Sequence, residues 1–437
     1  MNYRDYYNIT PLIVRADSRE TITISPRFPH ADLRRLKFVR VEYIRVDGVF
    51  EDGKTINGWN GYQTIDHTLA EDGTLQFTLL FRGEIEHSFR IIGKNYEGED
   101  IPIFTFAIYS LKEDLFNLRP YKGDFHLHTI NSDGAQTPEY MAASSRKIGM
   151  DFIAITDHRK YEPSLTAVAF QQRLSTSFRC YPGEEVHAPD NAVHIVNFGG
   201  SFSVNKIFQE DEARYRREVA EYAENVPETA FPESRFQVAA SEWVFDLIRK
   251  GGGIALYCHP YWKPHNRYYI LDEVNEVLLK RRNFDAIEVF GGYDLHELES
   301  NQLEVVRYYQ SRVEGVAAPA VGVSDSHSAD NGSLFGWFYT IVFADQFDFS
   351  SIAQAIRANR CVAVEAVKGE FPRIVGDFRL VKYAYFLLRE FYPIHDRLCA
   401  KEGELMLEVV EKDSSAAERL AMISHRIGDF VTSAWAK

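Results

Sequence analysis

Two histidines separated by one residue, with an aspartate shortly after them, stand in the segment KGDFHLHTINSDG at residues 122–134. In a β-strand, side chains at positions i and i+2 point to the same face, so His126 and His128 can reach one ion while Leu127 packs on the other side. Asp133 follows in the predicted loop. A His-x-His pair alone is also typical of a solvated strand end, but these residue types are those of a metal site.

Residues of the same types follow the ends of most other strands predicted after Pro120. In a parallel α/β barrel, the loops at the carboxyl ends of the strands gather in one place and form the active site. Six of seven predicted strand ends supply a His, Asp or Glu, and the strand AIEVFGG at 286–292 is the exception unless Glu288 contributes. One such motif would be an ordinary loop or a surface charge, but their repetition predicts a cluster. Its members are His126, His128, Asp133, His158, Glu185, His194, His259, Asp325 and His327.

The donor set limits the choice of metal. Imidazole and carboxylate ligands without thiolate suit zinc, manganese or iron, whereas calcium prefers oxygen alone. Cys258 adjoins His259, but alternation along the strand predicts that its thiol points away into the core. Nine candidates are too many for one ion, which takes about four to six ligands. We therefore predict two or three divalent ions that share a bridging carboxylate.

The region after Pro120 alternates short apolar strands with amphipathic helices. Thr137 and Pro138 are predicted to begin one helix, and Ser241 another that ends at Gly251–Gly253. Strands buried on both faces and separated by helices predict a parallel sheet. Seven such units favour a barrel over an open sheet.

The flanking regions have different patterns. Before the barrel, segments such as TITIS (21–25) and LQFTLLF (75–81) alternate with period two, and turn signals such as Asp52-Gly53 separate them, which predicts an antiparallel β-sandwich or meander. His67 and His87 are isolated there and are predicted to be surface or packing residues. We therefore predict a β-sandwich-like domain at 1–118, a metal-binding barrel at 119–365 and a helical region at 366–437.

Composition restricts the partners. The net charge of −14 and the pI of about 5.5 disfavour long-range attraction of nucleic acid. Four cysteines without a CxxC motif argue against a disulfide framework or a zinc knuckle. The first residues lack a signal-peptide pattern, and no apolar run approaches the roughly 20 residues of a membrane span. We expect a cytoplasmic protein without membrane contact, in which the flanking regions are candidates for an oligomer interface.

Six segments taken in order resemble the motifs of the PHP (polymerase and histidinol phosphatase) domain: DFHLHTINSDG, FIAITDH, PGEEV, VHIVNFG, CHPYW and GVSDSH. The resemblance spans about residues 120–365. It implies a distorted seven-stranded (β/α) barrel with metal-dependent phosphoesterase activity. The amidohydrolases also have His-x-His and a late Asp, but they lack the combination of TDH, GxE and SDxH.

The PHP resemblance also implies which residues share each ion. The first ion would be held by His126, His128, Glu185 and Asp325, the second by Glu185, His194 and His259, and the third by Asp133, His158 and His327. Glu185, rather than Glu184, matches the GxE of the family and would be the bridging carboxylate. Glu184 would point to the opposite face or support the ligands from behind.

We predict a phosphoesterase that hydrolyses a small phosphorylated substrate with a metal-bound hydroxide and no protein nucleophile. Arg159 and Lys263, which follow His158 and His259, could offset phosphate charge, and His187 and His265 could protonate the leaving group; the alternative for each is a solvated side chain. The helical segment FQEDEARYRREVAEYAENV could lie over the site or be an ordinary surface helix. Two other functions remain open, namely hydrolysis of a carboxyl ester or carbamate, and a non-catalytic binding role for a metal-stabilised protein.

Overall fold

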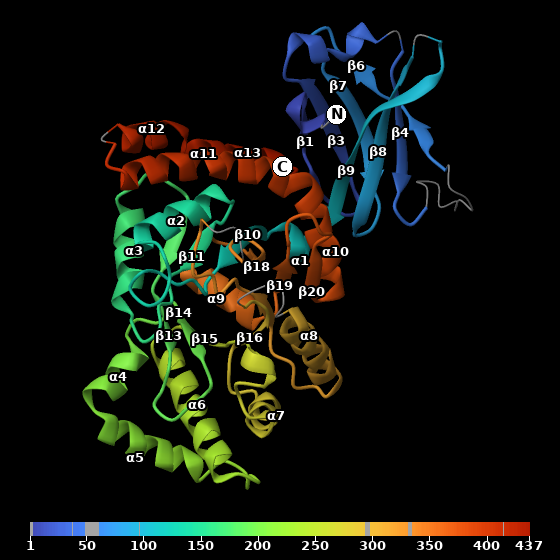
Figure 1. The fold of residues 1–437 in the computed structure, drawn as a ribbon. Helices are drawn as coiled ribbons and strands as arrows, with labels where there is room; N and C mark the ends of the chain where they lie inside the picture. The colour runs from blue at the N-terminus through green and yellow to red at the C-terminus, as the bar shows by residue number, and fades with distance from the viewer. Residues whose placement is uncertain are drawn as a thin grey trace. The chain divides into compact units, whose positions relative to one another are not determined.

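The computed structural model describes residues 3–36, 38–48, 61–95, 97–292, 298–330, 334–413 and 415–437. The chain divides into two compact units (Figure 1). Unit 1 comprises Met1–Leu118, Lys382–Arg397 and His425–Lys437, and unit 2 comprises Arg119–Val381 and Leu398–Ser424. Residues after 381 are therefore shared between the two units. The turn predicted at Asp52-Gly53 lies outside the described residues.

Unit 1 contains two sheets. The four-stranded sheet has the order β1 (Tyr7–Thr10), β3 (Ser18–Pro26), β7 (Leu75–Phe81), β6 (Thr68–Leu69), and the five-stranded sheet has the order β2 (Ile13–Arg15), β9 (Asp100–Leu111), β8 (Ile85–Lys94), β4 (Arg40–Arg45), β5 (Gln63–Ile65). Among these described strands, β2 pairs with β9 in parallel and the other pairs are antiparallel. The period-two pattern appears as alternating burial along β7. Phe77 of β7 contacts Phe89 of β8, with ring centroids 5.0 Å apart, so the two sheets share an aromatic core.

His87 lies inside this core. Its Nδ1 is 2.9 Å from the Tyr43 hydroxyl and its Nε2 is 2.9 Å from the Ser110 hydroxyl. Burial lowers the pKa of His87 to about 3. Of the two roles predicted for this histidine, the structure therefore shows the packing role.

Acidification is expected to destabilise unit 1 through His87. Between pH 6.5 and 3 an unfolded histidine binds a proton, while the folded imidazole remains neutral. The stabilisation is complete above about pH 6.5 and is lost as the pH falls, by at most about 1.4 kcal/mol per pH unit. Urea unfolding of the full chain from pH 7.5 to pH 5 should show this loss, and His87→Gln should reduce the slope. An equal slope in His87→Gln, or the same reduction in the His67→Gln control, would contradict the assignment.

Unit 2 is a mixed α/β fold with two sheets. The six-stranded sheet has the order β12 (Arg179–Tyr181), β11 (Phe152–Ala154), β10 (Arg119–Asp124), β18 (Phe338–Ala344), β19 (Cys361–Glu365), β20 (Arg373–Gly376). The five-stranded sheet runs β13 (Gly183–Val186), β14 (Ile195–Phe198), β15 (Ile254–Tyr257), β16 (Ala286–Phe290), β17 (Ala320–Gly322). Two isolated parallel bridges join the two sheets of unit 2. One links Leu127, after β10, with Ser326, after β17, and the other links His158, after β11, with Glu185 of β13.

The strand pairing differs from the predicted all-parallel sheet. The segment 178–186 forms two strands in different sheets, β12 and β13, which are separated at Pro182, a residue without an N–H for the ladder. β14 is antiparallel to both β13 and β15. The eight residues 187–194 between β13 and β14 are too few for the crossover of a dozen or more residues that parallel strands need. The sequence analysis also missed β18 and β20, both of which pair antiparallel with β19.

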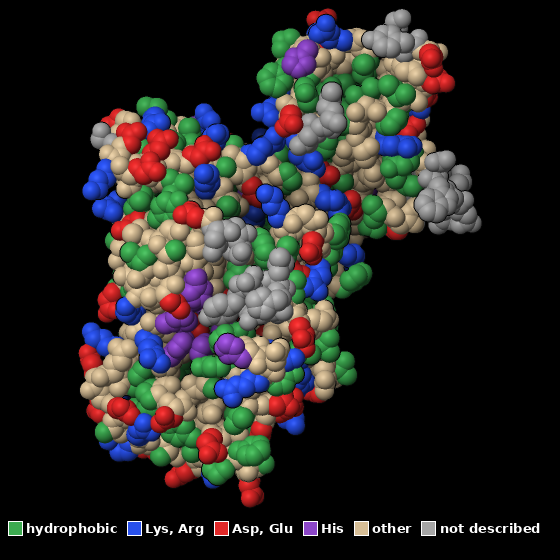
Figure 2. Space-filling view, viewed as in Figure 1, with side chains coloured by type: hydrophobic (Ala, Val, Ile, Leu, Met, Phe, Trp, Pro, Cys, Tyr) green, Lys and Arg blue, Asp and Glu red, His purple; other side chains and the backbone are tan. Residues whose placement is uncertain are grey.

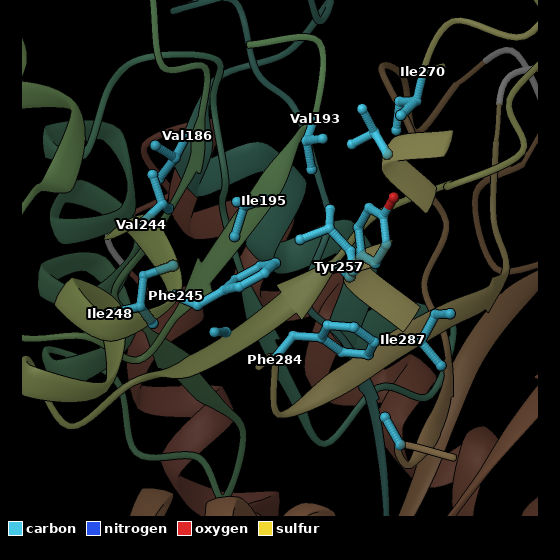
Figure 3. Close-up of a cluster of buried hydrophobic side chains, with 14 of the residues drawn as sticks. Val186, Val193, Ile195, Val244, Phe245, Ile248, Tyr257, Ile270, Phe284 and Ile287 are labelled. Carbon is cyan, nitrogen blue, oxygen red and sulfur yellow. The ribbon is translucent and has the colours of Figure 1, made fainter. Parts of the chain in front are cut away.

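Helices cover these sheets. α2 (Pro138–Lys147) packs on β11, α3 (Glu162–Gln172) on β12, α6 (Pro232–Lys250) on β14 and β15, α8 (Leu298–Val313) on β16, and α9 (Phe349–Arg357) on β18. Figure 3 shows the apolar core beneath α6, where Phe245 and Ile248 lie with Ile195 of β14 and Tyr257 of β15. The other helices are α1 (Glu113–Phe116), α4 (Val204–Glu210), α5 (Glu212–Ala223), α7 (Asp272–Arg281), α10 (Phe378–Phe386), α11 (Tyr392–Val410), α12 (Ala416–Ile423) and α13 (His425–Ala434). No described helix is long and apolar enough to cross a membrane.

Helix boundaries were predicted correctly where local signals decide them. The Thr137 side chain caps α2 by accepting a hydrogen bond from the Tyr140 N–H at 3.3 Å, and Gly251 caps the end of α6. The predicted start at Ser241 is wrong, because α6 begins at Pro232. The Ser241 hydroxyl instead donates to the Gln237 carbonyl one turn earlier, an arrangement that a mid-helix serine adopts. α5 is a surface amphipathic helix that buries only Tyr215 and Val219.

Candidate metal centre

The predicted ligands meet at strand ends of unit 2, beginning with the segment after β10. The His128 N–H donates to the Ser326 carbonyl at 3.0 Å, and on the other side the Thr156 N–H donates to the Leu127 carbonyl at 2.8 Å. This segment is therefore held between the ends of two other strands. Leu127 is buried, and the imidazole rings of His126 and His128 lie with their centroids 5.2 Å apart.

The first group of ligand atoms, subsite 1, consists of His126, His128, Glu185 and Asp325. His126 Nε2 and His128 Nε2 lie 3.2 and 2.8 Å from Asp325 Oδ1. Both nitrogens also lie 3.5 Å from Glu185 Oε2. All four side chains are buried, so subsite 1 is the deepest part of the cluster.

The other carboxylate oxygen of Glu185 faces subsite 2, which consists of Glu185, His194 and His259. Glu185 Oε1 lies 3.0 Å from His194 Nδ1 and 3.7 Å from His259 Nε2. His187 Nε2 lies 3.3 Å from the same oxygen. Because the two oxygens of Glu185 face different subsites, this side chain is placed to bridge them.

Subsite 3 consists of Asp133, His158 and His327. Asp133 Oδ2 is 3.3 Å from His158 Nε2, and its Oδ1 is 3.3 Å from His327 Nε2. The Asp133 side chain is 54 % exposed, whereas the Asp325 side chain in subsite 1 is 2 % exposed. Subsite 3 thus lies on the solvent side, and Figure 2 shows histidine side chains gathered on the surface of unit 2.

The pKa values within the cluster shift in both directions. Although burial raises the pKa of Glu185, the neighbouring His187, His194 and His126 lower it well below its usual value. Burial is the main cause that lowers the pKa of His128 to about 4 and that of His194 to about 3. Against the effect of burial, nearby carboxylates raise the pKa of His126 and His259, and Glu185 raises that of His158 to about 9. Glu185 is therefore held ionised, which is the form in which a carboxylate binds a metal.

The donor atoms also lack partners. Within the described part of the chain, neither oxygen of Glu185, nor His126 Nε2, nor Asp325 Oδ1 has a hydrogen bond of acceptable geometry. Buried polar atoms are normally satisfied, and each exception needs an explanation. Oxygen and imidazole nitrogen atoms that converge in this way fit divalent cations such as zinc, manganese or iron. The residues present therefore fit a metal centre.

Backbone conformation marks the same positions. His259 and Asp325 adopt positive φ angles of 26° and 51°, and Arg159, directly after His158, has a φ of 60°. Non-glycine residues rarely adopt such angles, which concentrate at functional sites. Cys258 is buried in the apolar core, as predicted. Its predicted orientation away from the ligands is wrong, because β15 ends at Tyr257 and strand alternation does not extend to Cys258. A group of potential ligand atoms within 4.8 Å of one another includes its thiol, His126 and Glu288.

Glu288, the residue left open by the sequence analysis, supports subsite 1 from behind. It lies on β16, and its Oε2 is 3.2 Å from His126 Nδ1, the ring nitrogen opposite the one that faces Asp325. Metal-binding histidines usually donate their second N–H to such a carboxylate. The sequence indicated Glu288 as a candidate because it lies on the sixth of the seven predicted strands, but nothing in the sequence predicted its contact with His126.

Two further carboxylates position ligands without facing the subsites. Asp157 accepts hydrogen bonds from the Thr129 N–H at 2.7 Å and the Ser132 hydroxyl at 2.5 Å, which fixes the loop before Asp133. Glu184 points away from the cluster, which is one of the two alternatives that the PHP resemblance left open, and accepts from the Val204 N–H at 2.5 Å at the start of α4. Glu184 therefore attaches α4 to β13.

Changing Glu288 to glutamine is expected to weaken metal binding at subsite 1 by about 10- to 100-fold, the usual effect of losing a carboxylate behind a histidine ligand. Titration of the chelator-treated chain with Zn²⁺ against a competing chelator would measure this change. Glu242→Gln is a matched control, because Glu242 is also buried but pairs with Arg281 instead. Equal zinc affinity in Glu288→Gln and the wild type would refute the role.

The four predicted substrate-binding residues are placed differently. His187 joins the ligand cluster. The Arg159 N–H donates to the Glu185 carbonyl at 3.0 Å, and its side chain is exposed. Lys263 pairs with Glu299 at 2.9 Å, and His265 lies on an exposed turn. Only His187 and Arg159 are thus held directly against the cluster.

Aromatic residues that the sequence analysis did not assign also border subsite 2. The Tyr269 ring centroid is 5.3 Å from that of His194 and 4.9 Å from that of Trp262. Trp262 in turn lies 5.6 Å from His259. Tyr269 is 43 % exposed, so part of this aromatic surface is available to a bound molecule. The only sequence signal was the tryptophan in CHPYW.

Comparison with known proteins gives short or distant similarities. No family model matches the sequence. A stretch of 53 residues, 12% of this chain, is 43% identical to DNA polymerase/3'-5' exonuclease PolX of Bacillus subtilis, and it spans 9% of that protein. A two-domain protein of Bacteroides vulgatus, described as containing a PHP-like metal-dependent phosphoesterase, is 19% identical with a TM-score of 0.42 over 62% of this chain and 71% of that chain.

The chain is similar to PHP-like metal-dependent phosphoesterases. A protein of Bifidobacterium adolescentis assigned as a metal-dependent phosphoesterase is 20% identical, with a TM-score of 0.33 over 48% of this chain and 89% of that one. An amidohydrolase of Chromobacterium violaceum with bound sulfate is 19% identical, with a TM-score of 0.30 over 47% of this chain and 87% of that one. The TM-scores of these structures are below 0.5, so the roles of residues in this chain are argued from the geometry of its own side chains.

Proposed function

We propose that this chain is a metal-dependent hydrolase that acts as a phosphoesterase on a small phosphorylated substrate. The observation that carries the proposal is the position of Glu185, whose two buried oxygens face separate groups of ligand atoms. Oε2 faces the histidines of subsite 1 and also lies 2.6 Å from His158 Nδ1 of subsite 3, while Oε1 faces subsite 2. Such a carboxylate suits a centre of two or three ions. The PHP resemblance of the motifs supports hydrolysis of a phosphoester.

The nine predicted residues would hold the ions in the three subsites: His126, His128, Asp133, His158, Glu185, His194, His259, Asp325 and His327. Bound zinc, manganese or iron would supply Lewis acidity that activates water and offsets charge on a phosphoryl group. The residues behind the ligands keep this arrangement rigid, since Glu288 fixes the ring of His126 and Asp157 fixes the loop of Asp133. No protein nucleophile is assigned.

We also propose the finer architecture that the PHP resemblance implies. The two bridges between the sheets of unit 2 support a distorted seven-stranded (β/α) barrel within residues 119–365. The two sheets of unit 1 would form a β-sandwich-like domain over residues 1–118. A helical region over residues 366–437 would follow the barrel. The ends of the barrel strands would then gather the ligands.

The exposed side of the cluster indicates where the substrate enters. Asp133 of subsite 3 is half-exposed, and Arg159 follows His158 with its side chain in solvent. A guanidinium in this place would pair with phosphate oxygens. Tyr269 and Trp262 beside subsite 2 would pack against an organic group of the substrate. The net charge of −14 favours a small molecule over a nucleic acid.

Phosphate release tests the proposal. The full chain, freed of metal with a chelator, would be reconstituted with Mn²⁺, Zn²⁺ or Fe²⁺ and given a panel of small phosphomonoesters and phosphodiesters. We expect release that depends on the metal and is faster for substrates with an aromatic or other planar group. No release by fully metallated protein, together with cleavage of a carboxyl ester or carbamate panel, would replace the phosphoesterase assignment. Inactivity on both panels would favour a binding role.

A further inference from the structure

We infer that His187 is a fourth protein ligand of subsite 2, beside Glu185, His194 and His259. The inference rests on the metal centre of the proposed function and adds a ligand to the set that the PHP resemblance implies. The number of protein ligands at subsite 2 decides whether its ion can take part in chemistry. A tetrahedral ion with four protein ligands has no open position for water or substrate, whereas an ion with three has one. Subsite 2 would then anchor the centre, while subsites 1 and 3 would remain for chemistry.

The distances within subsite 2 are close to those of atoms that share an ion. Three imidazole nitrogens surround Glu185 Oε1, namely His194 Nδ1 at 3.0 Å, His187 Nε2 at 3.3 Å and His259 Nε2 at 3.7 Å. Ligands bound about 2.0–2.2 Å from a tetrahedral zinc ion are separated by about 3.3–3.6 Å. The separation of His187 from Glu185 falls in this range, whereas that of His194 is shorter and that of His259 slightly longer.

The position of His187 follows from the chain at the end of β13. Glu185 lies on β13, which ends at Val186, and His187 is the next residue. The 3.3 Å between His187 Nε2 and Glu185 Oε1 shows that these two side chains, two residues apart, lie on the same side of the chain. Val186 between them points to the apolar core, where Figure 3 shows it near Val244. The His187 ring also stacks on that of His194, with centroids 3.8 Å apart. In Glu-x-His, as in His-x-His, the first and third side chains face the cluster.

The backbone of His187 is fixed as well. Its N–H donates to Asn205 Oδ1 at 3.2 Å, and Asn205 is fully buried. Asn205 Nδ2 donates in turn to Glu184 Oε2 at 2.8 Å and to the Glu185 carbonyl at 3.0 Å. These contacts hold the end of β13 and the start of α4 together, so the imidazole is preorganised near Glu185.

A second contact defines the competing explanation. His187 Nε2 also lies 3.1 Å from His158 Nδ1, the ring nitrogen opposite the one that faces Asp133. If His187 only accepted a hydrogen bond from His158, it would orient a ligand of subsite 3 and would bind no ion itself. The two explanations predict different metal-binding behaviour for variants at position 187.

The first experiment measures bound cobalt. The full chain would be treated with a chelator, titrated with Co²⁺, and followed by elemental analysis and by the visible absorption of the ion. We expect His187→Ala to lose one ion per chain, or to bind it at least tenfold more weakly, with a loss of the intense bands of four-coordinate cobalt. His425→Ala, which changes an exposed histidine of α13, should match the wild type. Wild-type stoichiometry, affinity and spectrum in His187→Ala would overturn the inference.

The second experiment gives a positive signal and does not depend on the stability of His187→Ala. In His187→Cys a thiolate replaces the imidazole, and a thiolate bound to Co²⁺ produces a charge-transfer band in the near ultraviolet. We expect this band in the variant and not in the wild type. A folded His187→Cys protein that binds cobalt without the band would show that side chain 187 does not touch the ion. Cobalt binding and the thiolate band are both measured without turnover. A wild-type protein that binds metal but hydrolyses nothing would therefore contradict the proposed function without contradicting this inference.

Discussion

Replacing Glu185 with glutamine is expected to remove at least two bound ions and to reduce hydrolysis to the background of chelated protein. Glu185 Oε2 lies against the histidines of subsite 1, and Oε1 lies against His194 of subsite 2. An amide cannot place an anionic oxygen in both subsites. The loss of metal affinity should exceed the roughly 10- to 100-fold effect that removing a supporting carboxylate has.

The neighbouring Glu184 provides a matched control for this prediction. Both carboxylates are fully buried on β13, but Glu184 faces Ser203 and the N–H of Val204 instead of the ligands. Glu184→Gln should therefore lower the stability of the β13 to α4 connection and retain the bound metal. Elemental analysis and phosphate release would be measured on both variants. Retention of metal by Glu185→Gln, or loss of metal from Glu184→Gln alone, would show that Glu185 is not the bridging residue.

The candidate ligands could be predicted because their positions depend on local rules. Alternation along β13 separates Glu184 from Glu185. His126 and His128 face the same cluster as predicted, although β10 ends at Asp124 and Leu127 between them forms an isolated bridge. The strand ends are recognisable from short apolar runs, and a fold with parallel strands gathers those ends. The sequence analysis assigned His187 as a possible proton donor to the leaving group, and its contact with Glu185 was not predicted.

Contacts between distant parts of the chain could not be predicted in this way. The carboxylate of Glu288 reaches His126 across a sequence separation of 162 residues. The Leu12 N–H donates to the Ala434 carbonyl at 2.8 Å, which places the end of the chain in unit 1 with the first strands. Such contacts depend on the complete fold, and a pattern of apolar residues does not encode the partner.

The errors in strand direction have a similar cause. Apolar runs such as β14 and β18 indicate burial on both faces, which is typical of parallel sheets but also occurs in mixed ones. Whether two neighbouring strands run parallel or antiparallel depends on the length and path of the segment that connects them. The short segment between β13 and β14 was the signal in the sequence that this pair is antiparallel. The ligand His194 still reaches Glu185 because it precedes β14, whose start lies beside the end of β13 in the antiparallel pair.

Arg146 and Glu402 form a buried ion pair whose disruption is expected to destabilise unit 2 strongly. Arg146 of α2 is fully buried, and its Nε donates to Glu402 Oε2 at 2.9 Å. Its other nitrogens donate to the Met150 carbonyl at 2.9 Å and to the Ser177 hydroxyl at 2.9 Å. Glu402 belongs to the part of α11 in unit 2, so this pair fastens a C-terminal segment to α2.

Glu402→Ala should reduce the free energy of unfolding by about 3 kcal/mol, because the guanidinium of Arg146 would stay buried with Asp151, 3.3 Å away, as its remaining carboxylate partner. Urea unfolding with a chelator present would measure this loss without a contribution from bound metal. Glu404→Ala is the matched control, since Glu404 is 45 % exposed and pairs with Lys401 on the surface. The control should change the free energy by less than about 0.5 kcal/mol. Combining Glu402→Met with Arg146→Met should recover part of the loss, because the buried guanidinium that had lost Glu402 is then absent. Additive losses in that double variant would show that the residues stabilise unit 2 separately and not as a pair.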